Sequence, residues 1–463
     1  MELSLKEKIS YGVGAVGKDM VYMLTATFVL YYYQDLLHIN ALAMGIILLV
    51  ARVFDALNDP FMGIIVAKTK TRWGRFRPWL FTGSLLNALC LYLLFSAPSI
   101  KGAGLIVWAG VIYILWGVTY TMMDIPFWSM IPAFTKAGKE REGMSALGRS
   151  CAGVGSALVQ VFTMMAVYAL GKGNEVAGFR LVALLIGIIF VLFIGMTCFS
   201  IKEKSTVDMP TSTIKDMLKS LLNNDQALII VLTIVLVNVS VYITSNLVIY
   251  FFKYDLGGKS WYYNFTSFNT FGGATQILSM MLLFPLMRKF FNTIKIFHIA
   301  LWMAIVGYIT LFVITFMPMN IYILFVPAFF IFAANGMLLV LTTIFLANTV
   351  DYGEYKNKRR DESVIFSMQT FVVKLASGVA ALVAAICLAV FSFGSSSETG
   401  HIVKMSYQSL VGLRMTMTII PLIGLIVANV LFKKRYKLDD NYMKTIINEI
   451  EEKKCVNKNI NLE

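Results

Sequence analysis

The sequence predicts an all-α polytopic membrane protein with twelve transmembrane helices in two six-helix bundles. First, 58% of the 463 residues are hydrophobic and only 14% are charged, whereas a soluble domain carries about 25% charged residues. Second, long apolar runs recur without strand-like alternation, so the runs are expected to be helices. Third, the charged residues gather in short clusters between the runs. This composition excludes a soluble enzyme, a disordered chain and a nucleic-acid-binding protein.

Twelve apolar runs are long enough to cross a bilayer, which needs about 20 residues per helix. A polar segment, 202–225, separates the sixth run from the seventh, so we expect bundles at 1–201 and 226–433 and a cytoplasmic tail at 434–463. The linker should carry an amphipathic helix on the membrane surface, and the tail a solvated helix. This layout is typical of a secondary transporter, although a twelve-span channel or a membrane enzyme would share it. The runs lie near 11–37, 39–67, 78–98, 103–134, 150–170, 179–201, 226–252, 263–286, 296–316, 320–348, 364–392 and 406–433.

Loops rich in Lys and Arg alternate with loops that have few. The net charge is +14, and the rich loops are 68–77, 136–149, 202–225, 288–295 and 356–360. Positive residues mark the cytoplasmic side, so both termini are expected inside a bacterial cytoplasmic membrane. The bases of 68–77 and 351–363 suggest either an inside gate of salt bridges or ordinary loops. The poor loops hold Lys101, Lys172, Lys253, Lys259 and Lys404.

Among the ionisable residues within the predicted spans or at their edges, eight stand out as candidates for the membrane core. Such residues are expensive in a membrane and suggest a functional site. Four acids against four bases also suggest mutual pairing. They are Lys18, Asp19, Arg52, Asp55, Asp59, Asp124, Arg149 and Lys374.

Asp55 and Asp59 are four residues apart and therefore share one helix face. Two carboxylates in a low-dielectric environment repel each other unless a cation or a shared proton separates them. With the amide oxygen of the neighbouring Asn58, they predict a site for Na⁺ or Li⁺. The alternative is that Arg52 neutralises one of them in a structural salt bridge.

The fourth run contains YILWGVTYTMMDIPFWS, in which Tyr120, Asp124 and Trp128 fall on one helical stripe. An aromatic ring beside a carboxylate suits a sugar, because the ring packs on the apolar face and the carboxylate accepts hydrogen bonds from hydroxyls. Alternatively, Trp128 is a packing residue and Asp124 pairs with a base. Thr121 could face either the sugar or the carboxylate pair.

The remaining membrane charges leave similar alternatives. Asp19 beside Lys18 could form a self-neutralised pair or bind a polar solute. Lys374 has no carboxylate in its own half, so we expect its partner to be Asp55, Asp59 or Asp124 across the central cavity. The five cysteines have no disulfide or zinc spacing. No nucleophile with a base, metal triad or phosphate loop is present, so we expect no enzyme and no cofactor.

Several motifs together resemble one known family. They are SYGVGAVGKD, LVARVFDALNDPFMG, TRWGRFRPW, YILWGVTYTMMDIPFWS, VDYGEYK and SMQTFVVK. The chain is similar over essentially its whole length to the glycoside–pentoside–hexuronide:cation symporters of the major facilitator superfamily. That resemblance implies symport of a galactoside, such as melibiose, with Na⁺, Li⁺ or H⁺.

The resemblance also implies residue roles. Asp55, Asn58, Asp59 and Thr121 would hold the cation. Asp19 and Asp124 would bind galactosyl hydroxyls, and Trp128 would stack on the ring. The full set expected to contact sugar is Lys18, Asp19, Tyr120, Asp124, Trp128, Arg149, Thr370 and Lys374. The expected partners are the galactoside, the cation and membrane lipid, with any cytoplasmic regulator unidentified.

Two departures from the family pattern bear on the substrate. Leu339 stands where a pocket tryptophan is expected, and Ala67 stands where Asp or Asn is usual. A lost aromatic wall would change the contacts beyond the galactosyl ring. The rival interpretations are a proton-coupled carrier of another glycoside, pentoside or glucuronide, and a membrane sugar sensor that does not transport.

Overall fold

The computed structural model describes residues 3–135, 139–203, 219, 222–258, 260–357, 362–393 and 405–460. Within these ranges every regular element is a helix and no strand occurs, which confirms the predicted all-α class. Eleven helices in the described part of the chain are long and apolar enough to cross a membrane. The predicted third span, α3 (Arg77–Leu94), is shorter, contains Arg77 and Asn87, and is not among the eleven.

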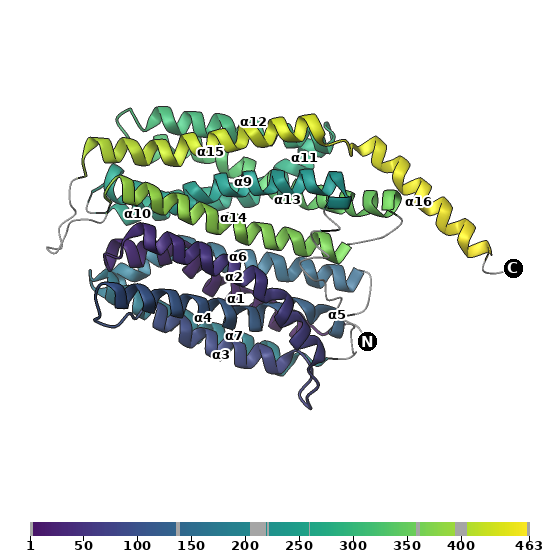
Figure 1. Ribbon diagram of the computed structural model, residues 1–463, viewed down its shortest axis with the longest axis horizontal. Coiled ribbons are helices and arrows are strands. Elements are labelled where there is room, and N and C mark those ends of the chain that lie inside the picture. The colour runs from purple at the N-terminus through teal and green to yellow at the C-terminus, as the bar shows by residue number, and fades with distance from the viewer. Residues whose placement is uncertain are drawn as a thin grey trace. The chain divides into compact units, whose positions relative to one another are not determined.

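Figure 1 labels the helices in chain order. The first group is α1 (Leu5–Tyr31), η1 (Tyr32–Leu36), α2 (Ala41–Lys68), α3, α4 (Ala103–Ser129), α5 (Ile131–Phe134), α6 (Lys139–Gly171) and α7 (Glu175–Ser200). The second group is α9 (Asp225–Tyr250), η2 (Phe251–Leu256), α10 (Trp261–Leu278), η3 (Ser279–Leu283), α11 (Phe284–Arg288), α12 (Thr293–Ile314), α13 (Ile321–Asn357), α14 (Glu362–Val390), α15 (Tyr407–Arg435) and α16 (Asp440–Ile460). The elements labelled η are π-helical turns.

The chain divides into two compact units. The first comprises Met1–Thr211, Val248–Asn269 and Ala381–Leu410, and the second comprises Ser212–Leu247, Thr270–Ala380 and Val411–Glu463. Segments from the later part of the chain therefore pack with the first helices. The predicted bundle boundaries at 201 and 226 remain a sequence-based prediction.

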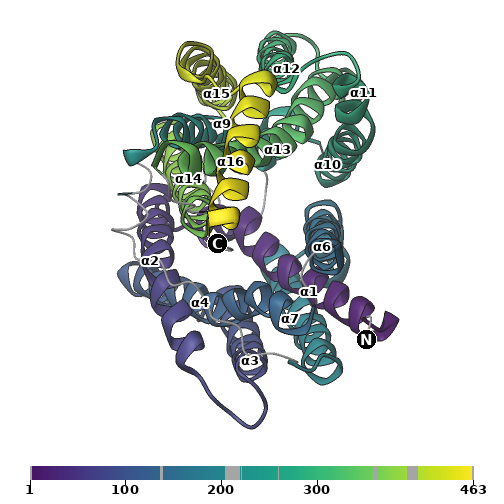
Figure 2. The ribbon, with the colours of Figure 1, turned by 90° about the vertical axis from the view of Figure 1, so that its right-hand side faces the viewer.

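In the first unit, α1 packs against α6 and α7, while α4 packs against α2 and α3 (Figure 2). Small residues allow these close approaches: a Cβ on Gly155 of α6 would lie 2.2 Å from the carbonyl oxygen of Val16. Helices in membranes commonly associate through close backbone contact, because the surrounding lipid is as apolar as their side chains and the hydrophobic effect does not drive them together. The tight packing fixes the inward-facing side chains of α1 and α4.

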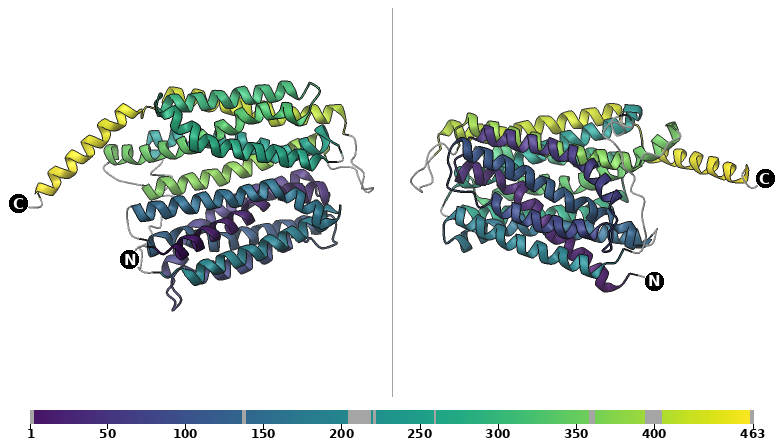
Figure 3. Two further views of the ribbon diagram at one scale, coloured as in Figure 1. Left: turned by 180° about the vertical axis from the view of Figure 1, so that it is seen from behind. Right: turned by 60° about the horizontal axis from the view of Figure 1, so that its bottom comes forward.

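In the second unit, α16 turns away from α15 (Figure 3). Its apolar residues Met443 and Ile446 are nevertheless buried in the hydrophobic core of this unit, and α16 contacts α13. The first turns of the tail helix are thus docked on the protein, whereas the sequence suggested a solvated helix. The next residue, Ile447, lies on another face of the helix and is 41% exposed.

Asp440 anchors the start of α16. Its Oδ2 lies 2.8 Å from Nη1 of Arg288, and its Oδ1 accepts a hydrogen bond of 2.5 Å from Thr293. Partial burial tends to raise the pKa of Asp440, but the hydrogen bonds from Thr293 and Arg288 outweigh it and lower the pKa below its ordinary value. The carboxylate is therefore charged at neutral pH and holds α16 to the ends of α11 and α12.

Two predicted gate segments are partly described. In the first unit, Glu203 accepts hydrogen bonds from the backbone N–H groups of Arg75, Phe76 and Arg77 at the start of α3. In the second unit, Lys356 lies 2.6 Å from Asp225. Residues 358–361, and most of the linker with its predicted amphipathic helix, lie outside the described residues. The inside gate stays a prediction.

Candidate functional site

The charged residues of α1 and α4 form one cluster. The Nζ atom of Lys18 lies 2.7 Å from Oδ1 of Asp124 and 3.1 Å from Oδ1 of Asp19, and it donates a 3.1 Å hydrogen bond to the Tyr120 hydroxyl. Both suggested pairings therefore occur together, because Lys18 is shared by two carboxylates. Separate helices bring these residues together, and the predicted stripe on α4 faces α1.

The two carboxylates differ from the lysine in exposure. The Lys18 side chain is 5% exposed, whereas those of Asp19 and Asp124 are 21% and 25% exposed. Ser156 of α6 donates a 2.9 Å hydrogen bond to Oδ2 of Asp19 and orients that carboxylate. A solute could thus reach carboxylate oxygens while the buried ammonium holds both acids in place.

An aromatic surface adjoins the carboxylates. Two cations lie over the Trp128 ring, with Lys18 Nζ 5.2 Å and the Arg149 guanidinium 4.5 Å from its centroid. Cations near the ring are attracted by its negative face. With Arg149, the cluster has two acids and two bases and no net charge. Trp128 is half-buried and Arg149 is exposed.

The second carboxylate pair lies on α2. Thr121 of α4 donates a 3.0 Å hydrogen bond to Oδ1 of Asp59, while Nη1 of Arg52 lies 3.6 Å from Oδ2 of Asp55. Thr121 thus faces the carboxylate pair, and the suggested Arg52–Asp55 salt bridge is present. Asn58 is half-buried. These oxygen atoms are the type of ligand that Na⁺ and Li⁺ prefer.

Gly117 is the residue of α4 that permits this approach. A Cβ atom at Gly117 would lie 2.2 Å from Oδ1 of Asp55. Since α4 carries Gly117 and Thr121 toward α2, and Asp124 and Trp128 toward the sugar candidates, one continuous helix bears residues of both candidate sites.

The contributions predicted from the second half are less complete. Lys374 is half-buried in α14 and belongs to the second unit, so its expected pairing across the cavity stays a prediction. Thr370 lies in α14, but its side chain is outside the described residues, as is that of Ala67. Leu339 is 43% exposed on α13.

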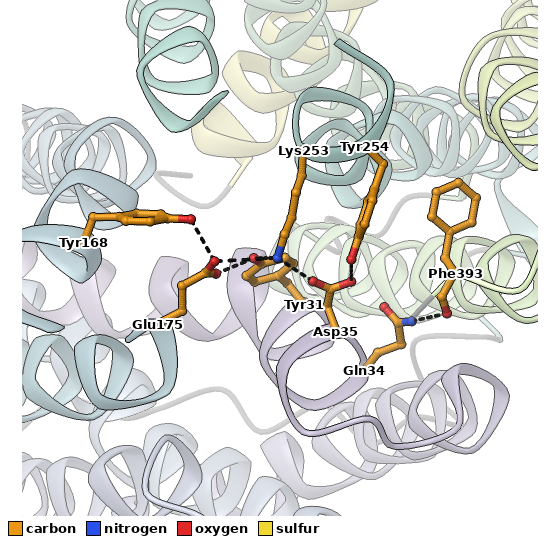
Figure 4. A network of polar contacts seen from close by, with 8 residues as sticks. All are labelled: Tyr31, Gln34, Asp35, Tyr168, Glu175, Lys253, Tyr254 and Phe393. Atoms are coloured by element: carbon orange, nitrogen blue, oxygen red, sulfur yellow. Dashed lines mark hydrogen bonds and ion pairs between the residues drawn. The ribbon is translucent and has the colours of Figure 1, made fainter. Parts of the chain in front are cut away.

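The structure also contains a buried charge network that sequence reasoning missed. Lys253 lies 2.7 Å from Oδ2 of Asp35 and 3.6 Å from Oε1 of Glu175 (Figure 4). The sequence placed Lys253 in a loop, but helical structure continues through η2 to Leu256. Asp35 lay inside the first predicted span, so the membrane cost of its charge was a usable signal.

Comparison with known proteins gives the family. Residues 10–440 match the family described as MFS/sugar transport protein. The chain belongs to this family. It is 27% identical over 453 residues to the Escherichia coli "Putative glycoside/cation symporter YagG", covering 97% of this chain and 95% of that protein. It is 25% identical over 468 residues to the "Lactose permease" of Lactobacillus delbrueckii subsp. bulgaricus, covering 97% of this chain and 73% of the permease.

Solved structures show the same fold. A bacterial homologue of the human lysosomal transporter Spinster, in an inward-facing and unoccupied conformation, matches with a TM-score of 0.69 and 14% identity. The match covers 92% of this chain and 95% of that structure. Membership of the sugar-transport family, together with the apolar helices, makes this chain a multi-pass membrane transporter of the major facilitator fold. Of the two relatives, one is named a putative glycoside/cation symporter and the other a lactose permease.

Proposed function

We propose that the protein is a secondary active symporter that couples entry of Na⁺, or of Li⁺ or H⁺, to uptake of a galactoside such as melibiose. The finer part of this proposal, the galactoside and the sodium ion, is supported by the motifs that resemble the melibiose carrier. The observation that carries it is the dual role of α4. Within eight residues this helix holds Thr121 against Asp59 and places Asp124 and Trp128 beside Lys18.

The sugar would bind at the cluster shared by α1 and α4. Asp19 and Asp124 would accept hydrogen bonds from adjacent hydroxyls, Lys18 and Arg149 would donate, and Trp128 would pack on the sugar ring. Because Lys18 already holds both acids, the carboxylates are preorganised before the sugar arrives. We also propose that Tyr120 positions Lys18, and that Thr370 and Lys374 contribute from the second half.

The cation would bind at Asp55, Asn58, Asp59 and Thr121. The Thr121 proton points to Asp59, so the lone pairs of the same hydroxyl oxygen remain for a cation. Binding would neutralise the carboxylate pair and fix α4, which would hold Asp124 in its binding position. By linkage, the sugar must raise cation affinity by the factor by which the cation raises sugar affinity. Alternating access would then carry both solutes across.

We propose a bacterial cytoplasmic membrane as the location, with both termini in the cytoplasm. The support is the alternation of Lys-rich and Lys-poor loops. Galactoside, cation and membrane lipid would be the only partners that the transport cycle requires.

The test is a binding panel with the purified protein. Galactosides, glucosides, pentosides and glucuronides are each titrated with Na⁺, with Li⁺ and with neither, at two pH values. We expect a galactoside to bind more tightly with Na⁺ or Li⁺. A response to pH alone supports the proton-coupled rival, and tight binding without uptake in vesicles supports the sensor. No saturable binding of any sugar would contradict the proposal.

A further inference from the structure

The charge network of Asp35, Glu175 and Lys253, here called the Lys253 network, lies apart from both candidate sites. The side chains are 1%, 15% and 10% exposed. Two carboxylates share one ammonium, so the network carries an excess negative charge in a buried position. Such a group in a membrane protein is expensive and suggests a function rather than packing alone.

Three tyrosines complete the network (Figure 4). Tyr254 donates a 2.6 Å hydrogen bond to Asp35, and Tyr168 donates a 2.8 Å hydrogen bond to Glu175. Tyr31 accepts a 2.6 Å hydrogen bond from Lys253 and donates its own proton to Glu175. These hydroxyls satisfy the carboxylates that the single lysine cannot neutralise.

The network joins helices that are distant in the sequence. Tyr31, Asp35, Tyr168 and Glu175 come from α1, η1, α6 and α7, whereas Lys253 and Tyr254 come from η2, more than 200 residues after Asp35. Gln34 adds a 2.7 Å hydrogen bond to the carbonyl oxygen of Phe393, beyond α14. These bonds contribute to the packing of 248–269 and 381–393 with the first helices.

All residues of the network lie next to loops that have few Lys and Arg residues. Tyr31 and Asp35 precede the loop 37–40, Tyr168 and Glu175 flank the loop 171–174, and Lys253 and Tyr254 precede the loop 257–260. The charge pattern assigns these three loops to the outside of the membrane. Both η1, with Asp35, and η2, with Lys253 and Tyr254, are π-helical turns. Such turns occur often at functional sites.

We propose that the Lys253 network is an extracellular latch, which closes the outer end of the transport path and must break each time that end opens. This inference rests on the proposed alternating-access transport. In that cycle the two six-helix halves separate at one end at a time. Asp35 and Lys253 belong to different sequence halves, so separation at the outer end parts them. Water entering the opened end then solvates the separated charges, which makes the break reversible.

Removal of the lysine should favour the open end. Lys253→Met leaves two buried carboxylates with no cation, a strongly destabilising arrangement, and opening would relieve it by hydration. The change is confined to the latch, because Lys253 contacts neither the Lys18 cluster nor the Asp55–Asp59 pair in the described contacts. Sugar binding should survive.

The experiment measures access from outside. In a chain whose native cysteines are replaced, Ala26→Cys provides a reporter on α1, half-buried and seven residues beyond Asp19 on the same helix face. Whole cells are treated with a membrane-impermeant maleimide. We expect Lys253→Met to accelerate labelling about tenfold or more. Loss of one partner of a buried ion pair destabilises the closed state enough to raise the population of the open state at least about tenfold. The matched control is Lys101→Met, an exposed lysine in another Lys-poor loop.

Two further variants address folding. Tyr254→Phe removes one hydrogen bond to the charged Asp35 and retains the ring, so we expect labelling about tenfold faster. The exchange Asp35→Lys with Lys253→Asp should return the rate toward that of the parent. Unchanged labelling in Lys253→Met and in Tyr254→Phe, with only a lower melting temperature, would overturn the latch and leave a static support. If the parent moves no sugar but labelling still accelerates, the proposed substrate is wrong and the latch stands.

Discussion

The Thr121–Asp59 hydrogen bond gives the sharpest prediction about the cation site. Thr121→Val keeps the shape of the side chain and removes the hydroxyl that lies 3.0 Å from Oδ1 of Asp59. In the proposed site the same hydroxyl oxygen contacts the bound cation, and we take this contact to contribute as much as a hydrogen bond to a charged group, about 1.5–3 kcal/mol. Since each 1.4 kcal/mol is tenfold, the half-saturating Na⁺ concentration should rise roughly 10- to 150-fold.

The assay is sugar binding to the purified protein as Na⁺ is varied. Sugar affinity at saturating Na⁺ should change little, because Asp124 and Lys18 are untouched. Thr121→Ser keeps the hydroxyl and is the matched control, with an expected Na⁺ dependence near that of the parent. An unchanged half-saturating Na⁺ concentration in Thr121→Val would refute the reasoning that this oxygen serves the cation.

Two other predictions concern packing and the tail helix. Gly117→Ala should raise the half-saturating Na⁺ concentration about tenfold or more, because the new Cβ would lie 2.2 Å from Asp55 Oδ1 and must displace it. Gly110→Ala on the same helix is the control: its Cβ would lie 3.7 Å from the nearest atom, so the half-saturating Na⁺ concentration should not change. Asp440→Asn should make trypsin cleave within α16 about two- to fivefold faster, since a partly exposed ion pair with Arg288 contributes at most about 1 kcal/mol. Because the folded pKa of Asp440 is lowered, its contribution is complete above an ordinary carboxyl pKa of about 4 and is lost as pH falls through the folded value. The protection factors of the α16 amides, which remove the intrinsic pH dependence of exchange, should therefore stay constant from pH 7 to about pH 5 and fall only below about pH 4. A fall already at pH 6 would contradict this assignment.

Membrane cost singled out the charged residues of the α1–α4 cluster from the sequence alone, but not that they share Lys18. Lys18, Asp19 and Asp124 lie in apolar runs, and the structure joins all three. Helical spacing also placed Trp128 on the same side as Asp124. The contacts could be anticipated because a charge in an apolar run and a helical repeat are both local signals. The role of these residues in sugar binding stays a prediction.

Other features depend on contacts between distant residues. Ser156 is a small polar residue in a helix, and only the packing of α6 on α1 shows that it serves Asp19. Lys253 was assigned to a loop because the apolar run ends before it, whereas a π-helical turn extends the helix and buries it. Its pairing with Asp35, 218 residues away, is not encoded in local periodicity.

The tail illustrates the same limit. Met443 and Ile446 fall on an apolar stripe that suits a solvated amphipathic helix as well as a docked one. The structure buries both residues against α13. The sequence contained the stripe, but the surface that covers it is formed by another part of the chain.

Sugar accumulation in vesicles tests the central claim most directly. One cation moving inward across 100 mV provides about 2.3 kcal/mol, which corresponds to roughly fifty-fold accumulation from the voltage alone. Vesicles that contain the parent protein should concentrate a labelled galactoside when a Na⁺ gradient and an inside-negative potential are imposed, and Asp59→Cys vesicles should only equilibrate it. Accumulation by Asp59→Cys on a Na⁺ gradient, or mere equilibration by the parent under every cation gradient, would contradict cation-coupled symport through this site.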